Sequence, residues 1–344
     1  MTSVATAGWA PWKRRAVELA QPLSAHLELT YACNWRCVFC YNPRHHDLRR
    51  MGGSEWLAIL DELRALGSLY VTLTGGECLT HPDFLEIARG VRARAMALRV
   101  LTNGALVDDS LADELAGLHA SVEMSIHGAR AETHDRTTAR PGSFAAMMAA
   151  AHRLRSRKVE VLLKTPLTSI NEGEIAELVA LVEGLGLPHR IDATLTPRDD
   201  GDRSPLAFVA SAAGLERAMR LSLARGHLPR TDRDRGGLNC GTGRITLTVD
   251  PEGNVYPCMQ WRKSSLGNVR VTPLRELWRT SPVREEAAAT ARAANDRMLD
   301  QGGGLAGFPF CPALAHQRTG DALVPDPSHV FQAELAARLR AETA

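Results

Sequence analysis

The sequence lacks the marks of a secreted or membrane-spanning protein. No apolar run approaches the roughly 18 residues that a membrane-spanning helix needs, and the N-terminal positive cluster follows Trp12 with no apolar segment behind it, unlike a signal peptide. Cysteine is also scarce, with seven in 344 residues. We therefore expect a cytoplasmic protein with reduced thiols, in which clustered cysteines indicate metal binding or catalysis rather than disulfides.

A strong excess of charge of either sign is absent as well. The formal net charge is +2. Such a balance gives no electrostatic reason to expect nucleic acid or an anionic membrane as a partner. Hydrophobic residues make up 44% of the chain, which suits an ordinary globular protein that buries a full core.

The scarce cysteines are not spread evenly: Cys33, Cys37 and Cys40 stand within eight residues. A closed structural metal site normally uses four ligands, and a disulfide framework uses an even number. Three thiolates hold a metal centre while one coordination position is left for chemistry. A non-enzymatic zinc site completed by His45 or His46 is the alternative at this point.

Short β-rich runs alternate with amphipathic helical stretches over the first two hundred residues. Segments such as 54–67 and 82–95 separate six candidate strands, and this spacing predicts parallel βαβ units. We expect an α/β fold with a partial (β/α)6 barrel, short of a complete eightfold one. The candidate strands are 25–31, 69–75, 97–103, 120–126, 159–165 and 189–195.

The pattern changes in the C-terminal third. The run RITLTVDPEGNVYPC (244–258) predicts a β-hairpin around an Asp-Pro-Glu-Gly turn, and the QGGG run at 301–304 predicts a flexible connector. A small α+β domain that contains this hairpin is therefore expected after the barrel. The expected units are an N-terminal extension (1–23), the barrel (24–230) and the small domain (235–344).

The spacing C-x3-C-x2-C, with Phe39 before the last cysteine and Tyr41 after it, resembles the cluster loop of radical S-adenosylmethionine (SAM) enzymes. The resemblance implies that three thiolates bind three irons of a 4Fe–4S cluster. The fourth iron then chelates SAM and passes it an electron. Cleavage of the sulfonium bond gives methionine and a 5′-deoxyadenosyl radical, which abstracts hydrogen from a substrate.

Further motifs of that family follow in order at the ends of the expected strands, over roughly residues 24 to 200. The resemblance implies that they contact SAM. Relatives commonly place an arginine at the position of Thr138, where it reaches the SAM carboxylate, and Arg136 or Arg140 would have to substitute for it here. The implied cofactor-binding residues are Gly75, Gly76, Glu77, Thr102, Asn103, Ser125, Arg140 and Lys164.

The remaining motif resembles the SPASM extension, which carries two auxiliary clusters. Cys240 and Cys258 fit C-x12-G-x4-C, and Cys311 follows downstream. The resemblance implies one auxiliary iron–sulfur cluster, expected as 4Fe–4S, on these three thiolates, as in the shortened twitch extension. Asp234, water or the substrate would complete it. Three unrelated buried cysteines are the alternative. The positions expected to hold a second auxiliary cluster contain no cysteine: Met298, Gln301, Gly307 and His329.

The resemblance implies an enzyme of natural-product biosynthesis that acts on a ribosomally made peptide precursor, by cross-linking, epimerisation, decarboxylation or oxidation. A sugar or aminoglycoside-like small molecule is the alternative substrate. The expected partners are an electron donor such as ferredoxin or flavodoxin and a separate peptide-recognition protein, because only 32 residues precede Cys33. No residue could be assigned a catalytic role beyond cofactor binding.

Overall fold

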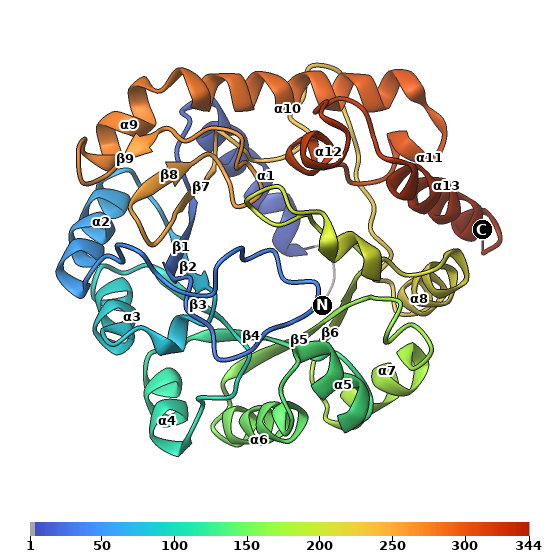
Figure 1. Cartoon of the computed structure of the whole chain (residues 1–344). Coiled ribbons are helices and arrows are strands. Elements are labelled where there is room, and N and C mark those ends of the chain that lie inside the picture. Colours follow the sequence, from blue (N-terminus) through green and yellow to red (C-terminus); the bar gives the residue numbers. More distant parts are fainter. Residues whose placement is uncertain (1–3, 344) are drawn as a thin grey trace.

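A single sheet runs through the protein, whose computed structural model describes residues 4–343, with side chains from residue 11 onward. Within these residues nine strands follow the order β6-β5-β4-β3-β2-β1-β7-β8-β9, and the six N-terminal ones curve into an open barrel (Figure 1). Neighbours from β6 to β7 are parallel, and the last two pairs are antiparallel. The strands are β1 (Ser24–Thr30), β2 (Tyr70–Gly75), β3 (Ala97–Thr102), β4 (Ser121–Ser125), β5 (Glu160–Pro166), β6 (His189–Asp192), β7 (Thr246–Val249), β8 (Asn254–Tyr256) and β9 (Gly267–Asn268).

Helices cover the outer face of this sheet, and the C-terminal helices lie beside its open side (Figure 1). The helices are α1 (Val4–Glu18), α2 (Gly53–Ala65), α3 (Phe84–Ala93), α4 (Asp109–Gly117), α5 (Ala131–Thr138), α6 (Ser143–Ser156), α7 (Ile175–Gly184), α8 (Ala212–Ala224), α9 (Leu274–Thr280), α10 (Pro282–Gln301), α11 (Gly303–Ala306), α12 (Pro312–Thr319) and α13 (Pro327–Ala341), with 3₁₀ turns η1 (Cys78–Thr80) and η2 (Ser204–Phe208). Within the described residues no helix is long and apolar enough to cross a membrane.

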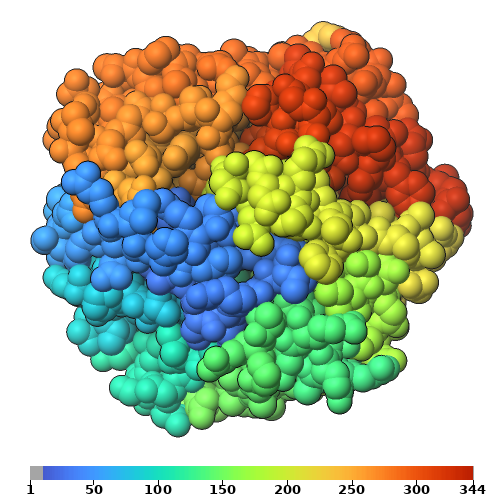
Figure 2. Space-filling view, viewed as in Figure 1, coloured from blue at the N-terminus to red at the C-terminus, as the bar shows by residue number. Residues whose placement is uncertain are grey.

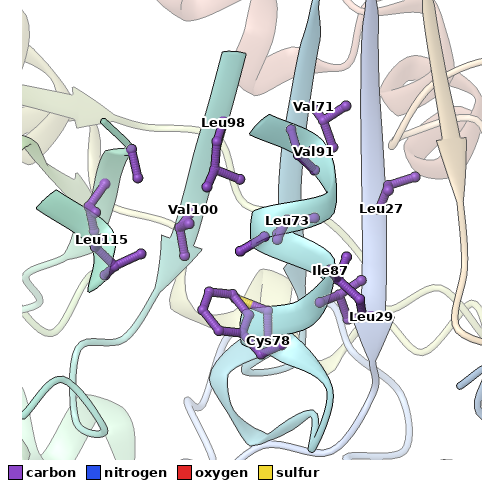
Figure 3. Packing of buried hydrophobic residues seen from close by; sticks show 14 of the residues in the cluster. Leu27, Leu29, Val71, Leu73, Cys78, Ile87, Val91, Leu98, Val100 and Leu115 are labelled. Atoms are coloured by element: carbon purple, nitrogen blue, oxygen red, sulfur yellow. The ribbon is translucent and has the colours of Figure 1, made fainter. Parts of the chain in front are cut away.

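The two faces of the strands differ in character. Leu27 and Leu29 of β1 are fully buried and pack with Val71, Leu73 and Val91 between the sheet and the helices (Figure 3). Because side chains alternate along a strand, the alternate residues of β1, such as the glutamate between these leucines, point to the other face. Those residues are polar, so the interior of the barrel offers polar groups that a cofactor can use.

The predicted fold class and strands are confirmed. Each of the six candidate strands overlaps an observed one, and the hairpin forms from β7 and β8, with Gly253 at φ +91° in its turn. The hairpin is not separate from the barrel, because β7 pairs in parallel with β1 and extends the same sheet. The domain boundary near residue 235 stays a prediction.

The expectation of a flexible connector at 301–304 was wrong. Gln301 ends α10, and Gly303 begins the short helix α11. Gly304 is buried against α13, where a Cβ atom would lie 2.3 Å from the carbonyl oxygen of Ala333. Glycine is therefore needed here for close packing rather than for mobility.

Candidate functional site

The cysteine-rich loop leaves β1 at its C-terminal end, where active sites form in barrels built from βα units. Backbone hydrogen bonds anchor part of this loop. The amides of Arg36 and Val38 donate to the carbonyl oxygens of Thr138 and Thr137, each at 3.0 Å. The end of α5 therefore holds the loop in place, although the loop itself has no regular secondary structure.

The three thiols of this loop influence one another. Burial raises the pKa of Cys33 to about 11, and the nearby Cys40 thiol adds to the effect. Burial also raises the pKa of Cys37, with further contributions from Cys40 and Cys33. Thiolates packed this closely need a positive charge to stay ionised, and bound iron supplies one. The loop therefore suits a metal cluster.

One cavity brings the three thiols together with the ends of the strands. Its volume is about 1230 Å³, including its open mouth. Six of the eight expected SAM contacts line this cavity, and they come from four different strand ends. They are Gly75, Gly76, Thr102, Asn103, Ser125 and Lys164.

Gly75 and Gly76 are required because β2 ends directly against the cluster loop. Gly75 has φ +126°, and a Cβ atom there would lie 2.3 Å from the carbonyl oxygen of Thr30. A Cβ atom on Gly76 would lie 2.5 Å from the carbonyl oxygen of Tyr31. Only glycine permits this approach, so the pair sets the distance between the strand end and the cysteines.

Glu77 does not belong to the described lining of the cavity, and its side chain is buried. Its carboxylate accepts hydrogen bonds from the backbone amide of Asn103 at 2.7 Å and from the Thr102 hydroxyl at 2.8 Å. Burial nevertheless raises the pKa of Glu77. The carboxylate therefore joins the ends of β2 and β3.

Sequence reasoning missed Asn34. The Asn103 side-chain amide donates to Asn34 Oδ1 at 2.7 Å, in the residue next to Cys33. A chain of contacts thus runs from Glu77 through Asn103 to the cluster loop. The spacing of 69 residues between the two asparagines left no local signal of this contact.

Arg140 and Arg136 are exposed and do not belong to the described cavity lining. Thr138, at the position where relatives commonly place an arginine, is buried, and its hydroxyl lies 2.7 Å from that of Ser143. Among the described residues that line the cavity, Lys164 is the only lysine or arginine. Its amino group pairs with Glu123.

A second group of thiols forms near the open side of the barrel. Burial raises the pKa of Cys240 to about 11 and that of Cys311 to about 12, and Cys258 contributes to both shifts. Cys258 and Cys311 pack around the same buried Trp261. The three thiols therefore lie near one another.

Two of the positions expected for a second auxiliary cluster, Met298 and His329, take part in hydrophobic packing. Met298 is fully buried with Phe308 and Phe310. The ring of His329 packs edge-on against both phenylalanines, with centroids 5.4 and 5.3 Å away. Asp234 is exposed, and its carbonyl oxygen accepts from Asn295 Nδ2 at 2.8 Å.

Among the described residues, the two groups of thiols are not arranged as ligands of one metal ion. Within residues 4–343 no set of three or more His, Cys, Asp or Glu side chains is placed to hold one metal ion. In an iron–sulfur cluster each thiolate binds a different iron, so the sulfur atoms need not converge on one point. His45 and His46 lie outside the described cavity lining.

The segment after Cys258 connects the two groups of thiols, because Met259 and Gln260 line the cavity of the first group. Residues 194–196, which follow β6, also line this cavity. Figure 2 shows the yellow-green chain after β6 between the blue cluster loop and the orange and red C-terminal region. The cavity is thus bounded by the cluster loop, the strand ends and the C-terminal region together.

Comparison with known proteins agrees with this arrangement. Residues 27–182 match the model of the radical SAM superfamily, and residues 240–301 match the SPASM model, described as an iron–sulfur cluster-binding domain. Among solved structures, anSMEcpe with bound AdoMet superposes with a TM-score of 0.70 at 15% identity, over 94% of this chain and 98% of that one. This likeness shows the shared fold.

Three curated relatives illustrate the range of similar proteins. Mycofactocin maturase MftC of Mycobacterium ulcerans is 29% identical, over 70% of this chain and 69% of its own length. AdoMet-dependent heme synthase of Methanosarcina barkeri is 27% identical, over 89% and 95%. PqqA peptide cyclase of Gluconobacter oxydans is also 27% identical, over 89% and 90%.

Proposed function

Since the chain is a radical SAM enzyme with a C-terminal SPASM domain, we propose that it abstracts hydrogen from a ribosomally made peptide precursor. Two of the three relatives described above bear the names of a maturase and a peptide cyclase. The observation that carries the proposal is a single cavity that joins three cluster thiols to the strand ends and to the segment after Cys258.

Each of the two groups of thiols is suited to hold one iron–sulfur cluster. Cys33, Cys37 and Cys40 would hold the SAM-binding cluster, which supplies the electron for reductive cleavage of SAM. Cys240, Cys258 and Cys311 would hold one auxiliary cluster, which gives a substrate electron a place to go. The residues proposed to contact SAM are Gly75, Gly76, Thr102, Asn103, Ser125 and Lys164.

The remaining residues of the site act by position and charge. Glu77 fixes the two strand ends that face SAM, and Lys164 offers the cation for its carboxylate. Arg140, which is exposed, is left out of this assignment. The cavity is lined by Phe39, Tyr41 and other side chains that restrict water around the reacting atoms. An electron donor of the ferredoxin or flavodoxin type in the cytoplasm, and a separate peptide-recognition protein, complete the proposal.

A small-molecule substrate is the second candidate, because the heme synthase relative aligns over 95% of its length. The two candidates separate by substrate size. A peptide extends beyond the cavity and should protect the surrounding loops from hydrogen exchange, whereas a small molecule should protect only the cavity lining.

The experiment is anaerobic incubation of purified protein with SAM and dithionite, with 5′-deoxyadenosine measured by liquid chromatography. Wild type should form it, and Cys37→Ala should not. Cys78→Ala is the matched control, because this buried thiol donates to the Leu101 carbonyl oxygen at 3.2 Å and does not belong to the described cavity lining. Absence of 5′-deoxyadenosine from iron-loaded wild type would rule out the proposed reaction.

A further inference from the structure

A second cavity lies between the end of β6 and the C-terminal helices. Its walls come from β6, α8, α12, α13 and the segment before α12, and its volume is about 980 Å³, including its open mouth. Figure 1 shows α8 beside α13 at this edge of the molecule. None of the residues proposed to contact SAM belongs to its described lining. The assignment of the first cavity therefore leaves this one unexplained.

The lining of the second cavity is mainly apolar and partly aromatic. Phe308 and Phe310 line it, and the ring of His329 meets them at 62° and 70°. Burial lowers the pKa of His329 to about 4, so its ring is uncharged near neutral pH. Its Nε2 is buried and has no hydrogen-bond partner among the described residues. Such a wall favours an aromatic ring, which gains from edge-to-face contacts.

One carboxylate at the rim is available to a ligand. Asp192 ends β6 and lines both cavities, as does Thr194. Within the described residues Asp192 forms no ion pair, and its Oδ1 accepts only from the Thr194 amide at 2.9 Å. Asp326 in the same cavity is already used, because it pairs with Arg318 at 2.8 Å and caps α13.

The two cavities also flank the two groups of thiols. The first is lined by Cys33, Cys37 and Cys40, and the second by Cys311. The short segment that carries Asp192 and Thr194 is the wall they share. A substrate that extends over this wall reaches both cavities.

We propose that the second cavity is a subsite for an aromatic side chain of the substrate, and that Asp192 holds a cationic group beside that ring. This rests on the proposed function, because the reacting part of the same substrate occupies the neighbouring SAM cavity. The ring packs against the wall formed by Phe308, Phe310 and His329, and the cation stays at the rim, where it offsets the unpaired carboxylate.

The probes are 4-fluorophenethylamine, a cation, and 4-fluorophenylacetate, an anion with a similar ring. Fluorine NMR line broadening measures their binding to the anaerobic holoenzyme. We expect the amine to bind at least tenfold more tightly than the acetate, and Asp192→Asn to remove most of this difference. Ser222→Phe on α8 should fill the cavity and abolish binding, while the matched control Ser222→Ala should keep it.

A second filling variant, Gln332→Trp on α13, guards against misfolding of the first, and circular dichroism and iron content verify both. Amine binding that persists in both filled variants would overturn the subsite. Equal binding of amine and acetate would overturn the role of Asp192. Formation of 5′-deoxyadenosine is measured in the same samples, so failure of the subsite is distinguished from failure of the proposed reaction.

Discussion

Arg262 Nη2 donates to Glu28 Oε1 at 2.5 Å inside the barrel, where both side chains are buried, with 7% and 0% exposure. Glu28 lies on β1, five residues before Cys33, and Arg262 follows Cys258 by four residues. The Arg262 guanidinium also lies over the Tyr256 ring, 4.8 Å from its centroid. One buried ion pair thus links the chain segments that carry the two groups of thiols.

Glu28→Gln should destabilise the protein strongly. The change leaves the buried Arg262 guanidinium with Asp199 alone, at 3.4 Å. Complete loss of a buried partner costs about 3–5 kcal/mol, so we expect a loss toward the lower end of that range. Denaturant unfolding followed by circular dichroism measures the loss. The control Glu114→Gln breaks the exposed pair with Arg89 and should cost less than about 1 kcal/mol. Similar losses in the two variants would speak against the linking role of the pair.

Asn34→Ala should weaken the first cluster without unfolding the protein. It removes the acceptor for Asn103 Nδ2, and loss of such an outer contact typically lowers metal affinity about 10–100-fold. The rate of iron transfer to a coloured chelator measures the effect. Arg49→Ala, an exposed change in the same loop, should leave that rate unchanged. If both variants lose iron at the wild-type rate, the contact does not support the cluster.

Gly76→Ala should abolish SAM binding. The new Cβ atom would lie 2.5 Å from the carbonyl oxygen of Tyr31 and would force β2 away from the cluster loop. Equilibrium dialysis with labelled SAM measures binding. Gly117→Ala is the control, because nothing lies within 4 Å of its Cβ position. Unchanged SAM affinity in Gly76→Ala would show that the close approach is not required.

His189→Gln should make the free energy of unfolding fall less steeply as the pH decreases. Burial, aided by Arg225, lowers the pKa of His189 to about 4. The unfolded chain binds this proton below about pH 6.5. The contribution of neutral His189 to stability is therefore fully present above pH 6.5 and is lost as the pH falls toward 4. Each pKa unit corresponds to about 1.4 kcal/mol. Glutamine does not titrate and can still bond to Thr165.

Unfolding free energies at pH 7, 6, 5 and 4.5 provide the comparison for His189→Gln. The exposed His152→Gln variant should retain the wild-type slope. A wild-type slope in His189→Gln as well would mean that His189 is protonated in the folded protein.

Local patterns sufficed to predict the six strands and the hairpin, because alternation and turn residues are encoded within a few positions. The two groups of thiols followed from spacing and resemblance. The contact of Asn34 with Asn103 and the pair of Glu28 with Arg262 join residues that are 69 and 234 positions apart. No periodicity in the sequence encodes such contacts, so they required the structure.

Arg140 and Glu77 show that the sequence does not predict the direction of a single side chain. A motif places a residue at the end of an element but does not say which way its side chain points. Glu77 turns beneath the cavity toward Asn103, and Arg140 is exposed to solvent. Both directions depend on how α5 and the strand ends pack, which involves several elements at once.

The most direct measurement is the iron and sulfide content, with EPR after reduction, of a Cys33→Ala/Cys37→Ala/Cys40→Ala variant prepared without oxygen. We expect about four irons to remain, as for one 4Fe–4S cluster, with a signal that SAM does not change. That result would place an auxiliary cluster on Cys240, Cys258 and Cys311. Complete loss of iron would contradict the two-cluster arrangement and leave a single-cluster enzyme.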